Sequence, residues 1–321
     1  MNVNFNSATL PLRAEFHLAD ARCLLSTNSH EVLKASLAWQ SSEKIFSVRR
    51  TFHMDIIESD SCGLAATDCT HFRGLRHLVF AKIEPRSFIT FDLLRRRVMG
   101  VLSPAAARDV HFWNSKFLPI TIGLLGTTMG IAPLHCACLD RNGDALLVAG
   151  NSGVGKSTLT AALAKQGFGV VSDDCTYVSK DGAELVAHGL FSRVKLLPDA
   201  VRFFPELQDF ALKETLNGEI AHEIDPASVF QSKVKTRSRP KWMLFLERKA
   251  ERGSQFVRCA PEHFAHFFEK NAEKLPLELQ DAIRGRSEII QSLSRCDSWI
   301  LHTGDSPMQT AAAIDEFLSE V

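Results

Sequence analysis

The sequence predicts an α/β fold in which a small α/β domain precedes a nucleotide-binding domain of the P-loop type. The main observation is the segment Gly150–Ser157, which fits the phosphate-binding pattern G-x-x-x-x-G-K-[ST] at every fixed position. The apolar run Ala145–Ala149 directly before it predicts a buried strand, and a helical sequence follows it. A second apolar strand, Gly169–Ser172, ends in the acidic pair Asp173 and Asp174.

The length of the chain and its charge indicate how many domains it forms and which partners its surface favours. The chain has 321 residues, which is enough for two domains. We expect residues 1–128 to form the small domain and residues 129–321 to form the catalytic domain. The 37 basic and 37 acidic residues cancel, so no global field favours nucleic acid or an anionic membrane surface. The sequence therefore predicts neither a nucleic-acid partner nor a membrane partner.

Cysteine usage and the absence of targeting patterns predict a cytoplasmic protein. Several of the eight cysteines fall inside apolar runs, which is typical of buried thiols in a reducing compartment. The first residues lack a basic region followed by an apolar one, the pattern of a secretory signal. The segment Phe117–Leu134 carries no charge, but its prolines and glycines favour a buried helix near Ile120–Leu125 over a membrane span.

The N-terminal third shows secondary structure but no catalytic constellation. Strand-like runs occur at His77–Ile83 and Ser87–Phe91. A helix is predicted over residues 101–113, with Ser103 as its N-cap and Pro104 at its first position. These elements indicate the small α/β domain and leave its role open.

A hairpin leads into the phosphate-binding segment. The apolar runs Leu134–Leu139 and Asp144–Ala149 are joined by Asp140–Gly143, whose Asn-Gly pair is a strong signal for a tight turn. The strand before the glycine-rich loop is therefore expected to be the second strand of an antiparallel hairpin.

The chemistry expected of the loop follows from its backbone. Its glycines let successive N–H groups surround an anion, and the following helix directs the positive end of its dipole to the same place. The side chain of Lys156 would reach the β- and γ-phosphates of ATP, and the Ser157 hydroxyl would bind Mg²⁺. The residues predicted to bind the nucleotide are Gly150, Asn151, Ser152, Gly153, Val154, Gly155, Lys156, Ser157 and Thr158.

The acidic pair predicts phosphoryl transfer. One of the two carboxylates can hold Mg²⁺, and the other can accept the proton of an attacking hydroxyl. Arg193 and Lys195 share one strand face and either meet the transferring phosphate or are solvated surface cations. His135 is a further candidate for the site, although a lone histidine is more often structural.

The remainder of the chain predicts an irregular segment and several core elements. Phe210–Arg239 is polar and has alternating basic residues near its end. It is expected to be a solvated loop or a mobile loop that closes on nucleotide or substrate. A core strand is predicted at Trp242–Leu246 and a helix with buried phenylalanines at Pro261–Lys270. A last strand at Trp299–His302 precedes a final helix that opens at Pro307.

His135, the loop Gly150–Ser157 and Ser172–Asp174 together resemble the catalytic domain of HPr kinase/phosphorylase and its relatives, which include kinase-like proteins of bacterial peptide-maturation clusters. The stretch Ala187–Ala200 is also similar, and the resemblance covers roughly residues 130 to 321. It implies a P-loop α/β fold akin to phosphoenolpyruvate carboxykinase and transfer of a phosphoryl group from ATP, with Mg²⁺, to a serine hydroxyl. It further implies that Asp173 is the base and Asp174 the metal-side carboxylate.

Departures from this family leave the acceptor open. Thr158 stands where HPr kinases usually carry Glu, and their long signature after the acidic pair is absent. We therefore expect a protein or peptide serine other than that of HPr, with a small-molecule hydroxyl as an alternative acceptor. A nucleotide-dependent regulatory module without an acceptor is the second hypothesis. Because members of the family often assemble, the resemblance also raises a homo-oligomer as an expectation.

Overall fold

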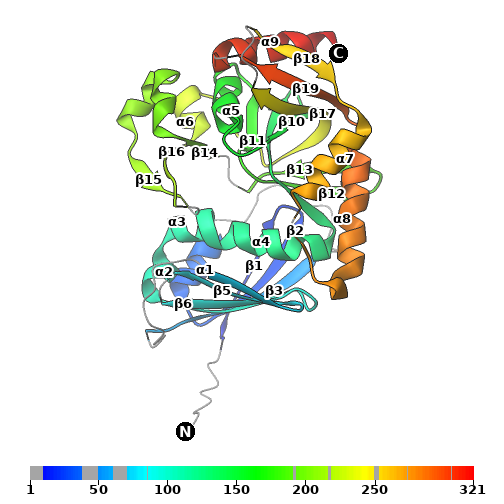
Figure 1. Cartoon of the computed structure of the whole chain (residues 1–321). Coiled ribbons are helices and arrows are strands. Elements are labelled where there is room, and N and C mark those ends of the chain that lie inside the picture. The colour runs from blue at the N-terminus through cyan, green and yellow to red at the C-terminus, as the bar shows by residue number, and fades with distance from the viewer. Residues whose placement is uncertain are drawn as a thin grey trace. The chain divides into compact units, whose positions relative to one another are not determined.

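The protein is a mixed α/β protein with two main sheets, as the sequence predicts (Figure 1). The computed structural model describes residues 10–37, 50–60, 71–84, 86–190, 193–215, 218–248, 253–272, 274–304 and 306–321. The chain divides into two compact units, the first formed by Met1–Ile131 with Lys274–Gly285 and the second by Ala132–Glu273 with Arg286–Val321. No pattern in the sequence indicates that residues 274–285 belong with the first unit.

The first unit contains a seven-stranded sheet in the order β1-β2-β3-β7-β6-β5-β4. Its strands are β1 (Leu12–Leu18), β2 (Ala21–Thr27), β3 (Thr51–Glu58), β4 (His71–Leu75), β5 (Leu78–Glu84), β6 (Ser87–Asp92) and β7 (Arg97–Leu102). The pairs β2–β3 and β3–β7 are parallel, and the other pairs are antiparallel. Strands β5 and β6 confirm the two strands predicted for this part of the chain.

The helices of the first unit show how capping residues divide a helical sequence. They are α1 (His30–Leu37), α2 (Pro104–Arg108), α3 (Val110–Phe112) and α4 (Leu118–Gly126). Ser103 caps α2 as predicted, because its hydroxyl accepts a hydrogen bond from Ala106 N at 3.1 Å. Asp109 then adopts an extended conformation and caps α3, so the single helix predicted over 101–113 is wrong. The predicted buried helix near Ile120–Leu125 lies within α4, and no helix of the described residues is long and apolar enough to cross a membrane.

The second unit contains a nine-stranded sheet, with the path β11-β9-β10-β17-β13-β12-β8 and β19 and β18 attached to β17. Its strands are β8 (Ile131–Leu134), β9 (Cys136–Arg141), β10 (Asp144–Gly150), β11 (Gly169–Ser172), β12 (Thr176–Asp181), β13 (Glu184–His188), β17 (Arg237–Arg248), β18 (Gln255–Arg258) and β19 (Asp297–Thr303). Strand β10 is parallel to β17, and β17 is parallel to β19. Strand β11 runs in the same direction, because β9 is antiparallel to both β10 and β11.

The hairpin predicted before the glycine-rich loop is confirmed by β9 and β10. Asp144 pairs with Arg141 across the turn, and Asn142 and Gly143 both have positive φ, at 58° and 100°. This conformation is that of a type I′ turn, which matches the twist of the two strands.

Helices cover both faces of this sheet (Figure 1), and β10 is buried after its first residue, Asp144. Leu146 and Val148 of β10 face a core that includes α5 (Lys156–Lys165) and α9 (Pro307–Glu320). Ala145, Leu147 and Ala149 face a second core that includes α7 (Pro261–Lys270) and α8 (Gln280–Leu293). An apolar strand between two helical layers is typical of parallel α/β sheets.

The prediction of an irregular loop over Phe210–Arg239 is wrong. The segment contains β15 (Leu212–Glu214), β16 (Ile220–Ile224), α6 (Pro226–Phe230) and the start of β17. Strands β15 and β16 form a small sheet with β14 (Val194–Leu196) in the order β14-β16-β15. The basic run near the end of the segment is an extended chain beside β11, since Val170 N donates to Lys233 O at 2.8 Å and Lys235 N donates to Val170 O at 2.9 Å.

Candidate active site

Four strands of the second unit end at the same edge of the nine-stranded sheet. Strands β10, β11, β17 and β19 run in one direction, so their carboxyl ends lie together. Strand β9 runs in the opposite direction, and its first residue, Cys136, lies opposite Ala149 at the end of β10. In open α/β sheets this edge is where ligands bind. It brings together the glycine loop (Gly150–Ser157), the acidic pair and His135.

The glycine loop joins β10 to α5, as the sequence predicts. Gly150 admits no side chain, because a Cβ there would lie 2.9 Å from Val154 Cγ1 and 3.0 Å from Leu246 O. Gly155 precedes the first residue of α5 and has a φ of 109°, a conformation that favours glycine. The loop therefore turns tightly from the strand into the helix, and the start of α5 points its free N–H groups toward the loop.

Lys156 lies inside the curve of the glycine loop. The residue is 7% exposed, and its Nζ donates hydrogen bonds to Gly150 O at 2.9 Å and to Asn151 O at 3.3 Å. Burial lowers the pKa of the Lys156 ammonium, and the carboxylates of Asp174 and Asp173 partly offset this effect. A lysine cation is therefore held against the loop backbone within electrostatic reach of both acidic side chains.

The two members of the acidic pair differ in their surroundings. Asp173 is 3% exposed, and its Oδ2 accepts a hydrogen bond from Lys195 N at 3.0 Å. Its Oδ1 is buried with no hydrogen-bond partner at normal distance among the described residues, although the hydroxyls of Ser157 and Thr160 are near enough to lower the pKa. Burial dominates and raises the pKa of Asp173 to about 6.

Asp174 is exposed and paired with His135. The side chain of Asp174 is 64% exposed, and its Oδ1 lies 3.1 Å from His135 Nε2. The hydrogen bond from His135 holds the pKa of Asp174 below its ordinary value, and the cations Lys195 and Lys156 act in the same direction. His135, which the sequence offered only as a candidate, therefore lies at the acidic pair, held in the connection between β8 and β9.

Arg248 is a site residue that the sequence analysis missed. It ends β17, the strand next to β10, and its Nε donates to Val154 O of the glycine loop at 3.2 Å. The preceding residue, Glu247, lies 3.5 Å from His302 of β19, measured between Glu247 Oε2 and His302 Nε2. The signal was the charged Glu-Arg pair directly after the predicted core strand, because polar residues that follow a parallel strand lie at the binding edge.

No interaction among the described residues connects Arg193 with the glycine loop or the acidic pair. Its side chain is exposed just before β14, and no hydrogen bond or ion pair in the described part of the chain involves it. The backbone N–H of the nearby Lys195 donates a hydrogen bond to Asp173, and the positive charge of Lys195 helps to lower the pKa of Asp174. Two residues of the stretch similar to the HPr kinase family, Phe191 and Ser192, lie outside the described residues.

A magnesium ion fits the residues at this edge. The buried Oδ1 of Asp173 has no hydrogen-bond partner among the described residues, and the Ser157 hydroxyl lies close to the same carboxyl group. Mg²⁺ is commonly bound by one or two carboxylates together with the phosphates of a nucleotide. The described residues contain no cluster of three or more histidine, cysteine or acidic side chains that could hold a metal ion alone.

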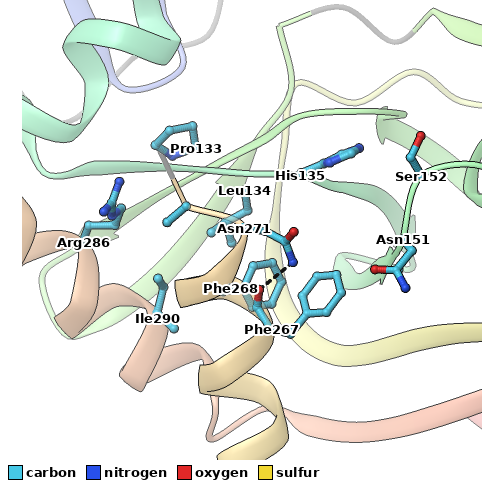
Figure 2. A pocket seen from close by; sticks show the side chains of 12 residues that line it. Pro133, Leu134, His135, Asn151, Ser152, Phe267, Phe268, Asn271, Arg286 and Ile290 are labelled. Atoms are coloured by element: carbon cyan, nitrogen blue, oxygen red, sulfur yellow. Dashed lines mark hydrogen bonds between the residues drawn. The ribbon is translucent and has the colours of Figure 1, made fainter. Parts of the chain in front are cut away.

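A cavity of about 150 Å³ lies beside the first residues of the glycine loop (Figure 2). Gly150, Asn151 and Ser152 line it from the loop, and His135 lines it from the connection before β9. Residues of β8, of α7 and the two positions after it, and of α8 form the rest of its wall. The cavity and the acidic pair thus share one residue, His135.

Comparison with known proteins finds a distant structural similarity. No protein-family model matches the sequence, and no curated protein matches it. Among solved structures, the chain is similar to the HPr(Ser) kinase/phosphatase of Coxiella burnetii, with 12% sequence identity and a TM-score of 0.32. The match covers 59% of this chain and 97% of the other chain.

Proposed function

We propose that this protein binds ATP with Mg²⁺ at the glycine loop and transfers the γ-phosphoryl group to a hydroxyl group. The observation that carries the proposal is the position of Lys156, buried in the glycine loop and within electrostatic reach of both Asp173 and Asp174. Phosphoryl transfer needs such an arrangement, with cations and N–H groups at the phosphates and a carboxylate at the acceptor. A serine of a protein or peptide is the acceptor that the resemblance of the sequence implies.

The loop and its neighbours would hold the nucleotide. The N–H groups of the loop and of the start of α5 would bind phosphate oxygens, and the Nζ of Lys156 would exchange its two carbonyl partners for phosphate. Asp173 and Ser157 would hold Mg²⁺, which when bound neutralises charge that develops on the phosphate oxygens. Arg248 would keep the loop in place through its bond to Val154 O.

The surroundings of the acidic pair favour the opposite order from the one that the resemblance implies. Asp173 is buried near Ser157, which suits a metal-side carboxylate. Asp174 is exposed and oriented by His135, which suits the group that meets the acceptor. The acceptor oxygen would form a bond to the γ-phosphorus as the bond to the bridging oxygen breaks. The hydroxyl proton would pass to Asp174, and ADP would leave with the bridging oxygen.

The test compares Asp173→Asn and Asp174→Asn in transfer from γ-labelled ATP into a lysate of the source cells. We expect Asp173→Asn to raise the Mg²⁺ concentration that gives half-maximal transfer by tenfold or more. We expect Asp174→Asn to keep the Mg²⁺ requirement and to lower the rate at saturation by at least about 100-fold. Lys156→Ala is the control for nucleotide binding and should weaken it in a direct titration.

Two outcomes of this test would change the proposal. The reverse pattern, with the Mg²⁺ requirement moved only by Asp174→Asn, would restore the order that the resemblance implies. ATP that is bound and hydrolysed steadily with no labelled acceptor, protein or small molecule, would contradict transfer and support a nucleotide-dependent regulatory module.

A further inference from the structure

The cavity beside the glycine loop has the size of a single small ligand. An engineered cavity of about 150 Å³ in another protein holds one benzene molecule, whereas sites for drug-sized ligands span roughly 300–1,000 Å³. A cavity of about 150 Å³ is therefore too small for a nucleoside but large enough for one side chain or one small metabolite.

The cavity has an apolar middle and polar ends. Leu134, Phe267, Phe268 and Ile290 contribute apolar surface. Figure 2 shows Arg286 of α8 on one side of these residues and Asn151 and Ser152 of the glycine loop on the other. A ligand that fills the cavity would meet a guanidinium at one end and the phosphate-binding loop at the other.

The loop end of the cavity adjoins the reacting groups. His135 lines the cavity and binds Asp174, the carboxylate proposed to receive the acceptor proton. A nucleobase would be separated from this carboxylate by the whole triphosphate, whereas an acceptor hydroxyl must lie next to it. The position of the cavity therefore favours an acceptor over the base of the nucleotide.

We infer that the cavity binds the phosphoryl acceptor, and that the acceptor carries a hydroxyl and a carboxylate separated by a short apolar segment. The inference rests on the proposed function and specifies its substrate. The carboxylate would pair with the guanidinium of Arg286, whose five N–H donors allow it to bind a carboxylate in addition to its partner within the chain. The apolar segment would pack on Phe267, whose position is fixed in part by the bond from Asn271 Nδ2 to Phe267 O at 2.7 Å. The hydroxyl would then lie at the loop, where Asp174 can take its proton.

The first experiment uses the full chain, γ-labelled ATP and two series of model acceptors. One series contains ω-hydroxy acids of three to six carbons, and the other contains the uncharged amides of the same acids. We expect at least one hydroxy acid to be phosphorylated with a KM at least tenfold below that of its amide. Equal KM values for acids and amides, or no transfer to either series and to the peptides below, would overturn the inference.

A second arm distinguishes a free hydroxy acid from a peptide as the source of the same chemistry. Two peptides with blocked ends carry a serine followed by glutamate or by glutamine. Preference for the glutamate peptide over the glutamine peptide, without transfer to free acids, would assign the carboxylate to a peptide acceptor and keep the inference. Equal use of both peptides would contradict it.

In the third experiment, substitutions of Arg286 and Phe267 test whether these residues bind the acceptor. Arg286→Gln should reduce the acid-to-amide preference, measured as the ratio of kcat/KM values, from tenfold or more to about one. Arg284→Gln is the matched control, because Arg284 lies on the same helix, is 70% exposed and does not line the cavity. A preference that survives Arg286→Gln would contradict the assigned carboxylate site. Phe267→Leu that raises the KM for ATP and leaves the KM for the acid unchanged would show a nucleobase site instead.

Failure of the inference can be told apart from failure of the proposed function. Binding of ATP with Mg²⁺ is measured by titration calorimetry in the wild type and in Lys156→Ala. Binding that depends on Lys156, together with no preference for acids, would remove only the acceptor assignment. Absence of ATP binding in the wild type would remove the proposed function itself.

Discussion

At the scale of single residues, the most unusual group is the buried carboxyl of Asp173. Burial raises its pKa from the ordinary value of 3.8 to about 6. As the pH rises, the unfolded chain loses this proton first, so the free energy of unfolding falls between about pH 4 and pH 6 and stays reduced above that range. A difference of about two pKa units corresponds to about 3 kcal/mol.

Asp173→Asn should therefore stabilise the protein at pH 8 in the absence of nucleotide and Mg²⁺. The amide is neutral, and its oxygen can still accept the hydrogen bond from Lys195 N, so the cost of a buried charge disappears. We expect the free energy of unfolding in urea to rise by about 2–3 kcal/mol at pH 8 and by much less at pH 4.5. Destabilisation at pH 8 would show that the ionised carboxyl is stabilised by groups beyond those described.

Arg248→Ala should weaken ATP binding through the loop. Removing the guanidinium frees the carbonyl of Val154, to which Arg248 Nε donates at 3.2 Å, and removes a cation from the sheet edge that carries the glycine loop. We expect the Kd for ATP to rise about fivefold to tenfold, which is about 1–1.4 kcal/mol. The matched control is Arg239→Ala near the other end of β17, where the side chain makes surface ion pairs with Asp144 and Glu184. An unchanged Kd for ATP in Arg248→Ala would show that this arginine does not support ATP binding by the loop.

The sequence predicted the glycine loop and the acidic pair, which belong to continuous motifs. It did not indicate Arg248, which belongs to none. The glycine loop and the acidic pair follow fixed local patterns, so their positions at one edge of the sheet could be expected. The pairing of His135 with Asp174 and of Arg248 with Val154 depends on which strands become neighbours. Strand order is set by long-range packing, which a local pattern does not contain.

At the scale of elements, the segment Phe210–Arg239 shows that polar composition alone does not predict a loop, because the segment contains strands and a helix. Its basic residues alternate, and a period of two is the pattern of an extended chain, although Val234 between them is also exposed. The polar composition of the segment predicts a loop, whereas its period predicts the extended chain that the structure contains. The strand β17 that follows was correctly predicted at its apolar part, Trp242–Leu246, but it starts five residues earlier, at Arg237.

Gly189→Ala tests how tightly the elements near the acidic pair pack. Gly189 directly follows β13, and a Cβ there would lie 1.7 Å from Val171 O of β11. Because the obstacle is backbone, β11 must move, and Asp173 lies only two residues after Val171. We expect a loss of at least about 3 kcal/mol in the free energy of unfolding and a large drop in nucleotide-dependent activity.

The control for this substitution is Gly123→Ala in α4 of the first unit. A Cβ at Gly123 would meet no heavy atom within 4 Å, so alanine should be neutral or should stabilise the helix by up to about 1 kcal/mol. Equal stability of Gly189→Ala and the wild type in urea unfolding would contradict the close approach of Gly189 to β11.

At the scale of the whole molecule, the sequence predicted a mixed α/β protein of two parts, but no pattern in it places residues 274–285 with the first unit. Residues 274–285 belong to the first unit, and Glu278 within them forms an ion pair with Arg76 at 3.0 Å across 202 positions of the chain. A contact of this sequence separation leaves no periodic or compositional trace in either segment. The balanced charge of the chain likewise carries no information about the acceptor.

Each unit has its own sheet and its own core, so ATP with Mg²⁺ should stabilise the second unit selectively. A ligand at 100 times its Kd stabilises the state that binds it by about 2.7 kcal/mol, which slows hydrogen exchange through unfolding of that unit about 100-fold. We expect this slowing for the amides of β10, α5, β11 and β17, and little change for β1–β7 of the first unit. Lys156→Ala is the control and should show no slowing at the same ATP concentration. Equal slowing in both sheets would mean that the two units unfold as one, and slowing confined to the first unit would contradict the glycine loop as the nucleotide site.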